Sequence, residues 1–191
     1  MHRRRLLEML ARYQRRFPDE SAVVDRIRRL VEGHPDCFER TCRPGHITGS
    51  AWVLSSDGAH CLLLHHKKLG RWLQPGGHAD GDPNALAVAL REAEEESGIS
   101  GLLPVGDAAL PTPIDLDVHL IPERRTGDGE LVESAHEHHD IRWLLVAPEG
   151  TQPVVSDESH AVRWCTAAEV MELTDEESVL RMLGKSGMRR E

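Results

Sequence analysis

Three glutamates near the middle of the chain have the spacing of a metal-binding helix face. Glu92, Glu95 and Glu96 stand at positions i, i+3 and i+4, so a helix places their carboxylates on one side, with Glu94 alongside. Like charges at this spacing destabilise a helix by about a few tenths of a kcal/mol per pair. Acids near the C-terminal end of a helix also oppose its dipole. A divalent cation removes both penalties, and carboxylate oxygens suit Mg²⁺ or Mn²⁺.

The segment in front of these glutamates predicts how the helix is placed. Pro75–Gly77 is a turn sequence, Asp82 is a good N-cap, and Pro83 is a good first helical residue. Gly98 provides a left-handed C-terminal stop, so we expect a helix over 83–97. Its apolar stripe is predicted to be Leu86, Leu90 and Ala93. A bare run of glutamates is often only a solvated acidic face, but the glycine turn leading into this helix favours a metal site.

The stretch Gly77–Ile99 resembles the Nudix box, G-x5-E-x7-R-E-U-x-E-E-x-G-U, where U is a bulky aliphatic residue. Gly77 matches the first glycine, and residues 91–99 match the second half in register. Pro83 departs from the pattern because the family usually has its first glutamate there, and Ala93 is small for a U position. The resemblance implies an α/β/α sandwich with a mixed sheet. It also implies a metal-dependent hydrolase that cleaves a diphosphate linkage by water attack on phosphorus.

The resemblance also implies roles for individual residues. A nucleoside diphosphate linked to another moiety X, or a related small phosphorylated metabolite, is the expected substrate, with Mg²⁺ or Mn²⁺ as cofactor. One carboxylate takes the proton of the attacking water, either a box glutamate or Glu158, which resembles in position an out-of-box glutamate of the family. The expected metal-binding residues are Gly77, Glu92, Glu95 and Glu96, and the expected catalytic residues are Arg91, Glu92, Glu95 and Glu158.

Two other functions remain open at this point. A non-catalytic Nudix module that binds a nucleotide and regulates a partner is suggested only by Pro83. An isomerase of isoprenoid diphosphates, which shares the fold, needs a paired cysteine and glutamate. Cys61 or Cys165 would have to supply the thiol, and no motif supports either.

Composition narrows the class of protein. The net charge of −9 argues against broad nucleic-acid binding, so no stable nucleic-acid partner is expected. No apolar run approaches membrane-spanning length, and four irregularly spaced cysteines favour reduced thiols in the cytoplasm. The expected partner is therefore a small diphosphate substrate, with no membrane association.

The rest of the chain predicts one α/β domain with an N-terminal appendage. Residues 1–44 indicate a helical hairpin, 1–17 and 21–33, followed by a connector; it packs on the core or on a second copy in a homodimer. Residues 45–184 form the hydrolase domain and 185–191 a frayed tail, with a mobile polar loop at 126–133. The predicted strands are 47–54, 61–65, 113–121, 136–146 and 162–165, and the C-terminal helices 167–171 and 176–183.

Twelve histidines are many for this length, and several flank the box. His136, His138 and Asp140 fall on one side of a strand, and such a triple can bind a transition metal; hydrogen-bonding histidines that line a cleft are the favoured alternative. A histidine-rich face predicts a rate that depends on pH around 6 to 7, roughly the unperturbed histidine range. The expected substrate-binding residues are Arg71, Gly76, His78, His119 and His138.

A zinc-like spacing also occurs in the connector, at His34, Cys37, Cys42 and His46. The usual zinc signature has two tight pairs of ligands, which this segment lacks. A proline-containing connector with incidental thiols is therefore the favoured interpretation.

Overall fold

Two long strands from opposite halves of the chain form the centre of the fold. The computed structural model describes residues 2–107 and 109–189. In it, β1 (Gly45–Leu54) and β9 (His136–Val146) pair in parallel, from Gly45 opposite Glu137 to Leu54 opposite Val146. Their side chains alternate between the two faces of the sheet, so each strand contributes to two different environments.

Six shorter strands extend this pair into an eight-stranded mixed sheet with the path β10-β2-β1-β9-β5. Off this path, β3 pairs with β2, β4 with β1 and β6 with β9, all antiparallel. The predicted bounds of β1, β2, β6 and β10 agree with the structure to within a few residues, and those of β9 agree in full. The shorter strands are β2 (Cys61–His66), β3 (Arg71–Leu73), β4 (Gly76–His78), β5 (Leu103–Pro104), β6 (Asp115–Ile121) and β10 (Ser159–Cys165).

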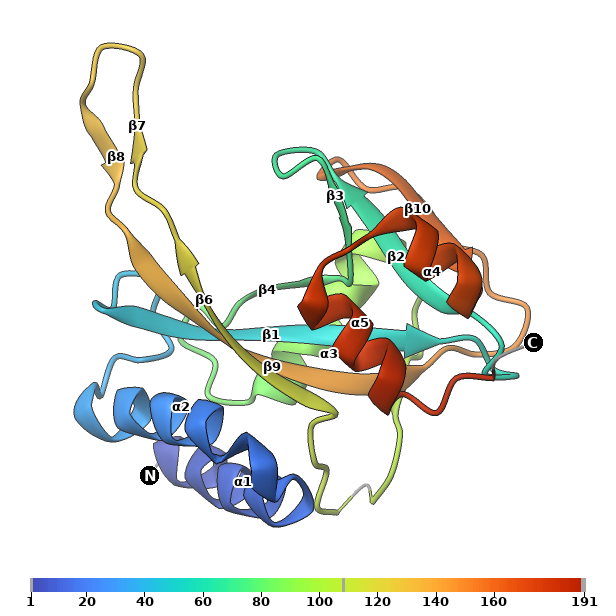
Figure 1. Cartoon of the computed structure of the whole chain (residues 1–191), viewed down its shortest axis with the longest axis horizontal. Helices are drawn as coiled ribbons and strands as arrows, with labels where there is room; N and C mark the ends of the chain where they lie inside the picture. The colour runs from blue at the N-terminus through green and yellow to red at the C-terminus, as the bar shows by residue number, and fades with distance from the viewer. Residues whose placement is uncertain (1, 108, 190–191) are drawn as a thin grey trace.

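Helices cover both faces of the sheet and complete the predicted α/β/α sandwich (Figure 1). On one face lie α1 (His2–Arg16), α2 (Ser21–Gly33) and α3 (Ala85–Ser97), with a 3₁₀ turn at Pro18–Glu20 between the first two. On the other lie α4 (Ala167–Leu173) and α5 (Glu177–Lys185). Met1, predicted to begin the first helix, lies outside the described residues. No helix among the described residues is both long and apolar enough to cross a membrane.

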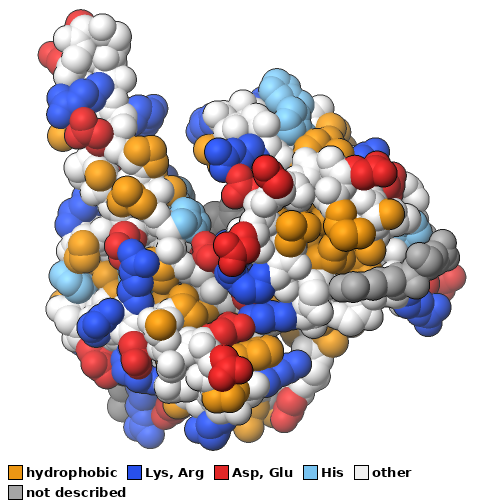
Figure 2. Space-filling view, in the orientation of Figure 1, with side chains coloured by type: hydrophobic (Ala, Val, Ile, Leu, Met, Phe, Trp, Pro, Cys, Tyr) orange, Lys and Arg blue, Asp and Glu red, His pale blue; other side chains and the backbone are white. Residues whose placement is uncertain are grey.

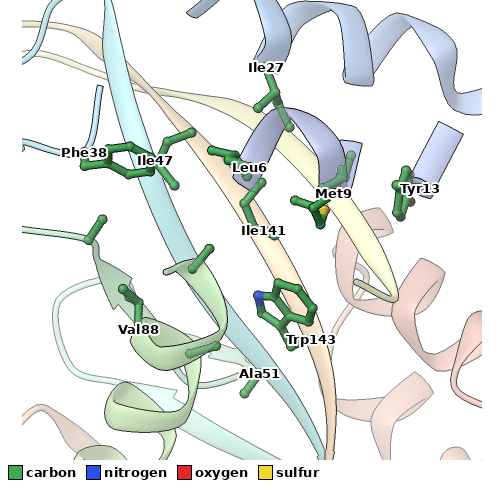
Figure 3. Packing of buried hydrophobic residues seen from close by; sticks show 14 of the residues in the cluster. Leu6, Met9, Tyr13, Ile27, Phe38, Ile47, Ala51, Val88, Ile141 and Trp143 are labelled. Carbon is green, nitrogen blue, oxygen red and sulfur yellow. The ribbon is translucent and has the colours of Figure 1, made fainter. Parts of the chain in front are cut away.

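The N-terminal helices share a hydrophobic core with the sheet. Leu6 and Ile27 pack toward Ile47, Ile141 and Trp143, and all are buried (Figure 3). The same cluster takes in side chains of α3, which lies on the same face. Burial of this apolar surface on both partners stabilises the docking of the hairpin on the domain.

A second hydrophobic cluster lies on the opposite face, around Trp52 of β1 and the helices α4 and α5. Cys61 and Cys165 are fully buried in it. Met188 also packs there with 7% of its surface exposed, so the prediction of a frayed tail from residue 185 is wrong as far as the chain is described. Lys185 ends α5 and forms an ion pair with Asp115 instead of extending into solvent.

A two-stranded arm projects from the sheet where a mobile loop was predicted (Figure 1). Its strands β7 (Arg124–Arg125) and β8 (Leu131–Glu133) pair with each other and continue the hairpin of β6 and β9. We call residues 120–135 the arm. Figure 2 shows a hollow between the arm and the part of the molecule formed by β2, β3 and α4.

Candidate active site

The helix that carries the glutamates begins two residues later than predicted. Asn84, not Asp82, is the N-cap of α3, and its side chain accepts a hydrogen bond from the backbone N–H of Ala87 at 3.3 Å. Asp82 instead accepts from the backbone N–H of Asn84, which closes the turn in front of the helix. The predicted stop at Gly98 is confirmed, with a left-handed φ of 68°. The helix is therefore fixed at both ends by residues of its own sequence.

Small side chains let α3 approach the sheet closely. The buried stripe consists of Ala85, Val88, Ala89 and Ala93, whereas Leu86 and Leu90, predicted to form it, are only half buried at its margin. Gly49 of β1 lies directly opposite, and a Cβ there would come within 2.7 Å of the Ala85 carbonyl oxygen. Alanines and a glycine are needed because helix and strand backbones almost touch at this point.

The close approach brings two box glutamates against the backbone of β4. The backbone N–H of Gly76 donates to Oε2 of Glu96 at 2.9 Å. A Cβ on Gly77 would collide with the carboxylate of Glu92, so a side chain there would push this carboxylate out of its present position. Glu96 is 6% exposed, and the Glu92 side chain 16%. Pro75–Gly77, predicted as a turn, instead leads into the strand β4, because Gly76 and Gly77 pair with β1. This strand and the helix α3 form one cradle.

Burial and mutual repulsion act on the acidity of these carboxyls. Burial, together with the neighbouring Glu92, Glu158 and Glu95, raises the pKa of Glu96 to about 7, while the Gly76 hydrogen bond acts in the opposite direction. Burial also raises the pKa of Glu92, and Glu158 contributes in the same direction. Glu158 precedes β10 and is close enough to repel both box glutamates electrostatically. Four carboxylates therefore share one region.

Arg91 connects the exposed Glu95 to the half-buried Glu92. It pairs with Glu95 at 3.4 Å, as its i,i+4 spacing predicts, and also with Glu92 at 2.8 Å. Its guanidinium donates to the backbone carbonyl of His78 at 3.1 Å. The side chain thus ties α3 to the end of β4 and fixes the orientation of two box carboxylates.

This donor set fits a hard divalent cation. Glu96 is a buried carboxylate with like-charged neighbours, and no basic side chain among the described residues lies within ion-pair distance of it. The box carboxylates are too far apart to bring three ligand atoms within 4.8 Å of one another. Two other groups in the described part of the chain do so, one of three histidines and one of His34, Asp36 and Cys42. A cation that draws oxygens together would remove the electrostatic penalty of their burial.

Comparison with known proteins decides the family. The NUDIX domain family model matches residues 46–183, which is most of the chain. The chain belongs to the NUDIX family. An RNA pyrophosphohydrolase of Erythrobacter litoralis is 31% identical over 97 residues, 51% of this chain and 56% of that protein. This chain therefore spans little more than half the length of that curated relative.

Solved structures agree on the fold. A NUDIX-family hydrolase from Clostridium perfringens aligns with a TM-score of 0.56 at 22% identity, over 74% of this chain and 95% of that one. The dihydroneopterin triphosphate pyrophosphohydrolase of E. coli aligns with a TM-score of 0.52 at 17% identity, over 75% and 95%. At such identities the likeness shows the fold and not the substrate.

The substrate-binding residues expected in this NUDIX domain fall into two groups. Gly76, His78, His119 and His138 lie on β4, β6 and β9, and the ring centroids of the three histidines are 5.0 Å (His78 to His138) and 5.4 Å (His119 to His138) apart. Arg71 lies elsewhere. It pairs with Glu176 and lines a cavity of about 180 Å³ between β3 and the segment joining α4 to α5, in which none of the box glutamates takes part.

The predicted histidine titration near pH 6 to 7 is not supported by the buried rings. Burial, with a smaller contribution from neighbouring histidines, lowers the pKa of His46 to about 3 and that of His138 to about 2. Burial likewise lowers the pKa of His78. These rings are neutral at neutral pH. In this NUDIX domain it is the carboxyl of Glu96 whose pKa is raised to about 7, mainly by burial.

Sequence reasoning missed a buried ionic network on the face of the sheet opposite α3. Asp140 accepts hydrogen bonds from Thr48 at 2.9 Å and Ser50 at 2.7 Å, and forms an ion pair with Arg142. The predicted H-x-H-x-D triple is therefore divided, because its aspartate binds these partners and not the histidines. The signal was the alternation of polar residues at positions 46, 48 and 50 of β1.

Asp115 is the centre of that network and is completely buried. The sequence predicted it on the polar face of a half-buried strand. It instead accepts from Arg142, from Arg181 at 2.9 Å and from Lys185 at 2.7 Å, so the two basic residues of α5 fasten this helix to β6. The network positions β6 and β9, which carry His119 and His138.

Proposed function

We propose that this chain is a metal-dependent diphosphatase acting on a nucleoside diphosphate linked to another moiety X, or on a related small phosphorylated metabolite. One observation carries the proposal. The carboxylates of Glu92 and Glu96 lie against the backbone of Gly76 and Gly77, buried and repelling each other, in the arrangement that a hard cation would stabilise. The complete R-E-x-x-E-E motif and the names of the relatives support the same chemistry.

The residues of the chain have separate tasks in this reaction. Glu92, Glu95 and Glu96, with the backbone of Gly77, would hold Mg²⁺ or Mn²⁺, which when bound neutralises a diphosphate and lowers the pKa of a water molecule. Arg91 keeps Glu92 and Glu95 in position through its two ion pairs. Phosphoryl transfer depends mainly on positioning and charge stabilisation, so this arrangement is sufficient.

The proton of the attacking water goes to a carboxylate that stays ionised near the metal. Glu158 and the box glutamates are the candidates, since Glu158 is close enough to raise the pKa of Glu92 and Glu96. Proton transfer to a positioned base contributes about 10²- to 10⁴-fold. Among Glu158→Gln and the box variants, the base is the residue whose loss lowers kcat without weakening Mg²⁺ binding.

The deciding experiment removes the carboxylates one at a time. Glu95→Gln and Glu96→Gln are each expected to lower Mg²⁺-dependent kcat/KM by about 100-fold or more, because a metal ligand or base is lost. Glu94→Gln is the matched control on the same helix, since its carboxylate accepts from the backbone of Gly101 and takes no part in the cradle. Circular dichroism confirms that each variant is folded. Unchanged turnover in both test variants would end the proposal.

The substrate is identified by a panel assayed with Mg²⁺ for phosphate or pyrophosphate release. Nucleoside diphosphate sugars, dinucleoside polyphosphates, nucleoside triphosphates, coenzyme A and RNA with a 5′-triphosphate cover the linkages that the proposal includes. Binding of one compound without turnover would favour a regulatory NUDIX module. Cys61 and Cys165 are fully buried in the second hydrophobic cluster, which gives no support to a cysteine-dependent isomerase.

The setting we propose for this activity is the cytoplasm. The cysteines Cys37, Cys42, Cys61 and Cys165 are free thiols, which is typical of proteins kept in reducing conditions. A small molecule is the proposed partner, and the exposed apolar side chains of the arm would be a contact surface if the chain forms a homodimer. Sedimentation velocity of the purified chain tests the last point.

A further inference from the structure

Five histidines from four strands form one cluster on the face of β4 opposite the box. His46 (β1) lies beside His138 (β9) in the sheet register, and His138 lies beside His119 (β6). The ring centroids of His46 lie 4.8 Å from those of His138, 5.0 Å from those of His136 and 5.1 Å from those of His78. His46 and His138 are 92 positions apart in the chain, and the pairing of β1 with β9 brings their rings together.

Three members of the cluster converge on one point. One ring nitrogen from each of His46, His136 and His138 lies within 4.8 Å of the other two. His46 is 1% exposed and His136 2%, and His138 is half buried beside them. Three imidazole nitrogens this close to one another in a mostly buried place are a ligand set suited to a borderline transition-metal ion.

The hydrogen bonding of His46 is incomplete without a further group. Neither of its ring nitrogens has a hydrogen-bond partner among the described residues, although the side chain is buried. A neutral imidazole has one donor and one acceptor nitrogen, and a buried polar atom without a partner is destabilising. A cation bound to the acceptor nitrogen would satisfy it. Hydrogen bonds within the cluster, the alternative that the sequence favours, do not.

The tautomer of His136 is also the one that a metal ligand requires. Its Nδ1 lies 2.9 Å from the backbone carbonyl oxygen of Ser134, so Nδ1 carries the proton and donates it. The lone pair is then on Nε2, which without a bound cation accepts a hydrogen bond from Nε2–H of His138 at 3.4 Å. Ligating histidines usually hold their other ring N–H in such a bond, which fixes the ring orientation.

We propose that His46, His136 and His138 form a second metal site that binds Zn²⁺ or a similar first-row transition-metal ion, separate from the Mg²⁺ site of the box. Imidazole nitrogens favour such ions over Mg²⁺, which prefers oxygen ligands. The carboxylate of Glu133 in the arm lies 3.8 Å from Nε2 of His136 and would be available as a fourth ligand. Gly77 and His78 separate the two sites, because a Cβ added at Gly77 would meet Glu92, whereas the ring of His78 lies beside that of His46.

The first experiment measures metal binding in the full chain and does not depend on activity. The protein is freed of metal with EDTA, exchanged into excess Mg²⁺ to occupy the box, and titrated with Zn²⁺ against a chromophoric chelator. We expect one equivalent to bind tightly to the wild-type chain. His46→Gln and His138→Gln are expected to weaken binding by at least about 100-fold, since even loss of a residue that only supports a ligand weakens binding by about 10–100-fold.

Two matched controls separate this site from its neighbours. His139→Gln changes the next residue of β9, which is as buried as His136 but lies on the other face of the strand and binds Glu137, so it should leave Zn²⁺ affinity unchanged. Cys42→Ser tests the other group with converging ligand atoms, His34, Asp36 and Cys42. Loss of Zn²⁺ binding in Cys42→Ser with retention in His46→Gln would overturn the proposal, as would equal affinity in all variants or no binding by the wild-type chain.

A second measurement needs no variant and holds even where a substitution prevents folding. X-ray absorption of the wild-type chain loaded with one equivalent of Zn²⁺ counts its ligands directly. We expect scattering from three imidazoles at about 2.0–2.1 Å and no sulfur. A sulfur shell at about 2.3 Å would place the ion at Cys42, and an oxygen shell with fewer than three imidazoles would place it at the box. Either result would overturn the proposal.

Discussion

The two faces of the sheet are built from opposite kinds of residues, although the same strands form both. Facing α3, the strands present Gly49 and Gly77, and the glutamates of the helix reach the strand backbone because no side chain lies between. On the other face, polar side chains meet one another, with Asp115 and Asp140 holding Arg142 in a buried ionic network. One site is therefore positioned by the absence of side chains and the other by a network of charges.

This difference predicts different responses to substitution. On the face toward α3, an added methyl group has no space and displaces a backbone. On the polar face, removal of one buried charge unbalances the network of charges that it held together. We therefore expect an added methyl group to lower the free energy of unfolding on the face toward α3, and a removed charge to lower it on the polar face.

Asp115→Ala tests the polar face and should have the largest effect. Three basic side chains, Arg142, Arg181 and Lys185, lose the carboxylate that they share. Breaking a buried ion pair by removing one partner typically lowers the free energy of unfolding by about 3–5 kcal/mol. Urea unfolding measures the change. Asp25→Ala, which removes an exposed ion pair with Arg28, is the control and should lose about 1 kcal/mol or less. A similar small loss for both variants would show that the network does not hold α5.

The burial of Asp115 could not be predicted from the sequence. The period of two in β6 was visible and the strand was predicted, but alternation alone places Asp115 in solvent. Its partners Arg181 and Lys185 are 66 and 70 residues away, and nothing in the local pattern reveals them. Local periodicity determines which residues share a face; the partners that cover that face come from tertiary structure.

The box was predictable for the opposite reason. Glu92, Glu95, Glu96 and Arg91 lie on one helix, so their relative positions follow from helical geometry alone, and the structure confirms the Arg91–Glu95 pair and the stop at Gly98. The beginning of the helix was placed two residues early because Asp82 and Asn84 are both good caps. His46 escaped notice as a neighbour of His138 because the pairing of β1 with β9 joins distant parts of the chain.

Gly49→Ala tests the face toward α3. Its Cβ would come within 2.7 Å of the Ala85 carbonyl oxygen and 3.1 Å of the Ala89 backbone nitrogen, and neither backbone atom can move alone. Overpacking of this kind lowers the free energy of unfolding by about 1–3 kcal/mol. The matched control is Gly184→Ala in α5, where an added Cβ meets nothing within 4 Å and should be neutral or stabilising. Equal unfolding free energies for the two variants would mean that α3 is not held at the distance that the cradle requires.

The two faces differ also in how protons affect stability. Burial raises the pKa of Glu96 from 4.5 to about 7, so the folded chain binds this proton more tightly than the unfolded chain. Its contribution to the free energy of unfolding is therefore present at low pH and lost as pH rises toward 7. Burial lowers the pKa of His46 from 6.5 to about 3, so its contribution is present above about 6.5 and lost as pH falls.

Glu96→Gln should reveal the first of these trends when unfolding is measured with EDTA from about pH 5 to pH 7. Relative to this variant, the wild-type chain should lose up to about 1.4 kcal/mol per pH unit as pH rises, because glutamine cannot ionise. His46→Gln, treated identically, should give the opposite slope. With Mg²⁺ in place of EDTA the trend for Glu96 should reverse, since proton and metal compete for the same carboxylate and the metal binds more tightly as pH rises. A wild-type-to-Glu96→Gln difference that is independent of pH in EDTA would place that carboxylate in water, outside the cradle.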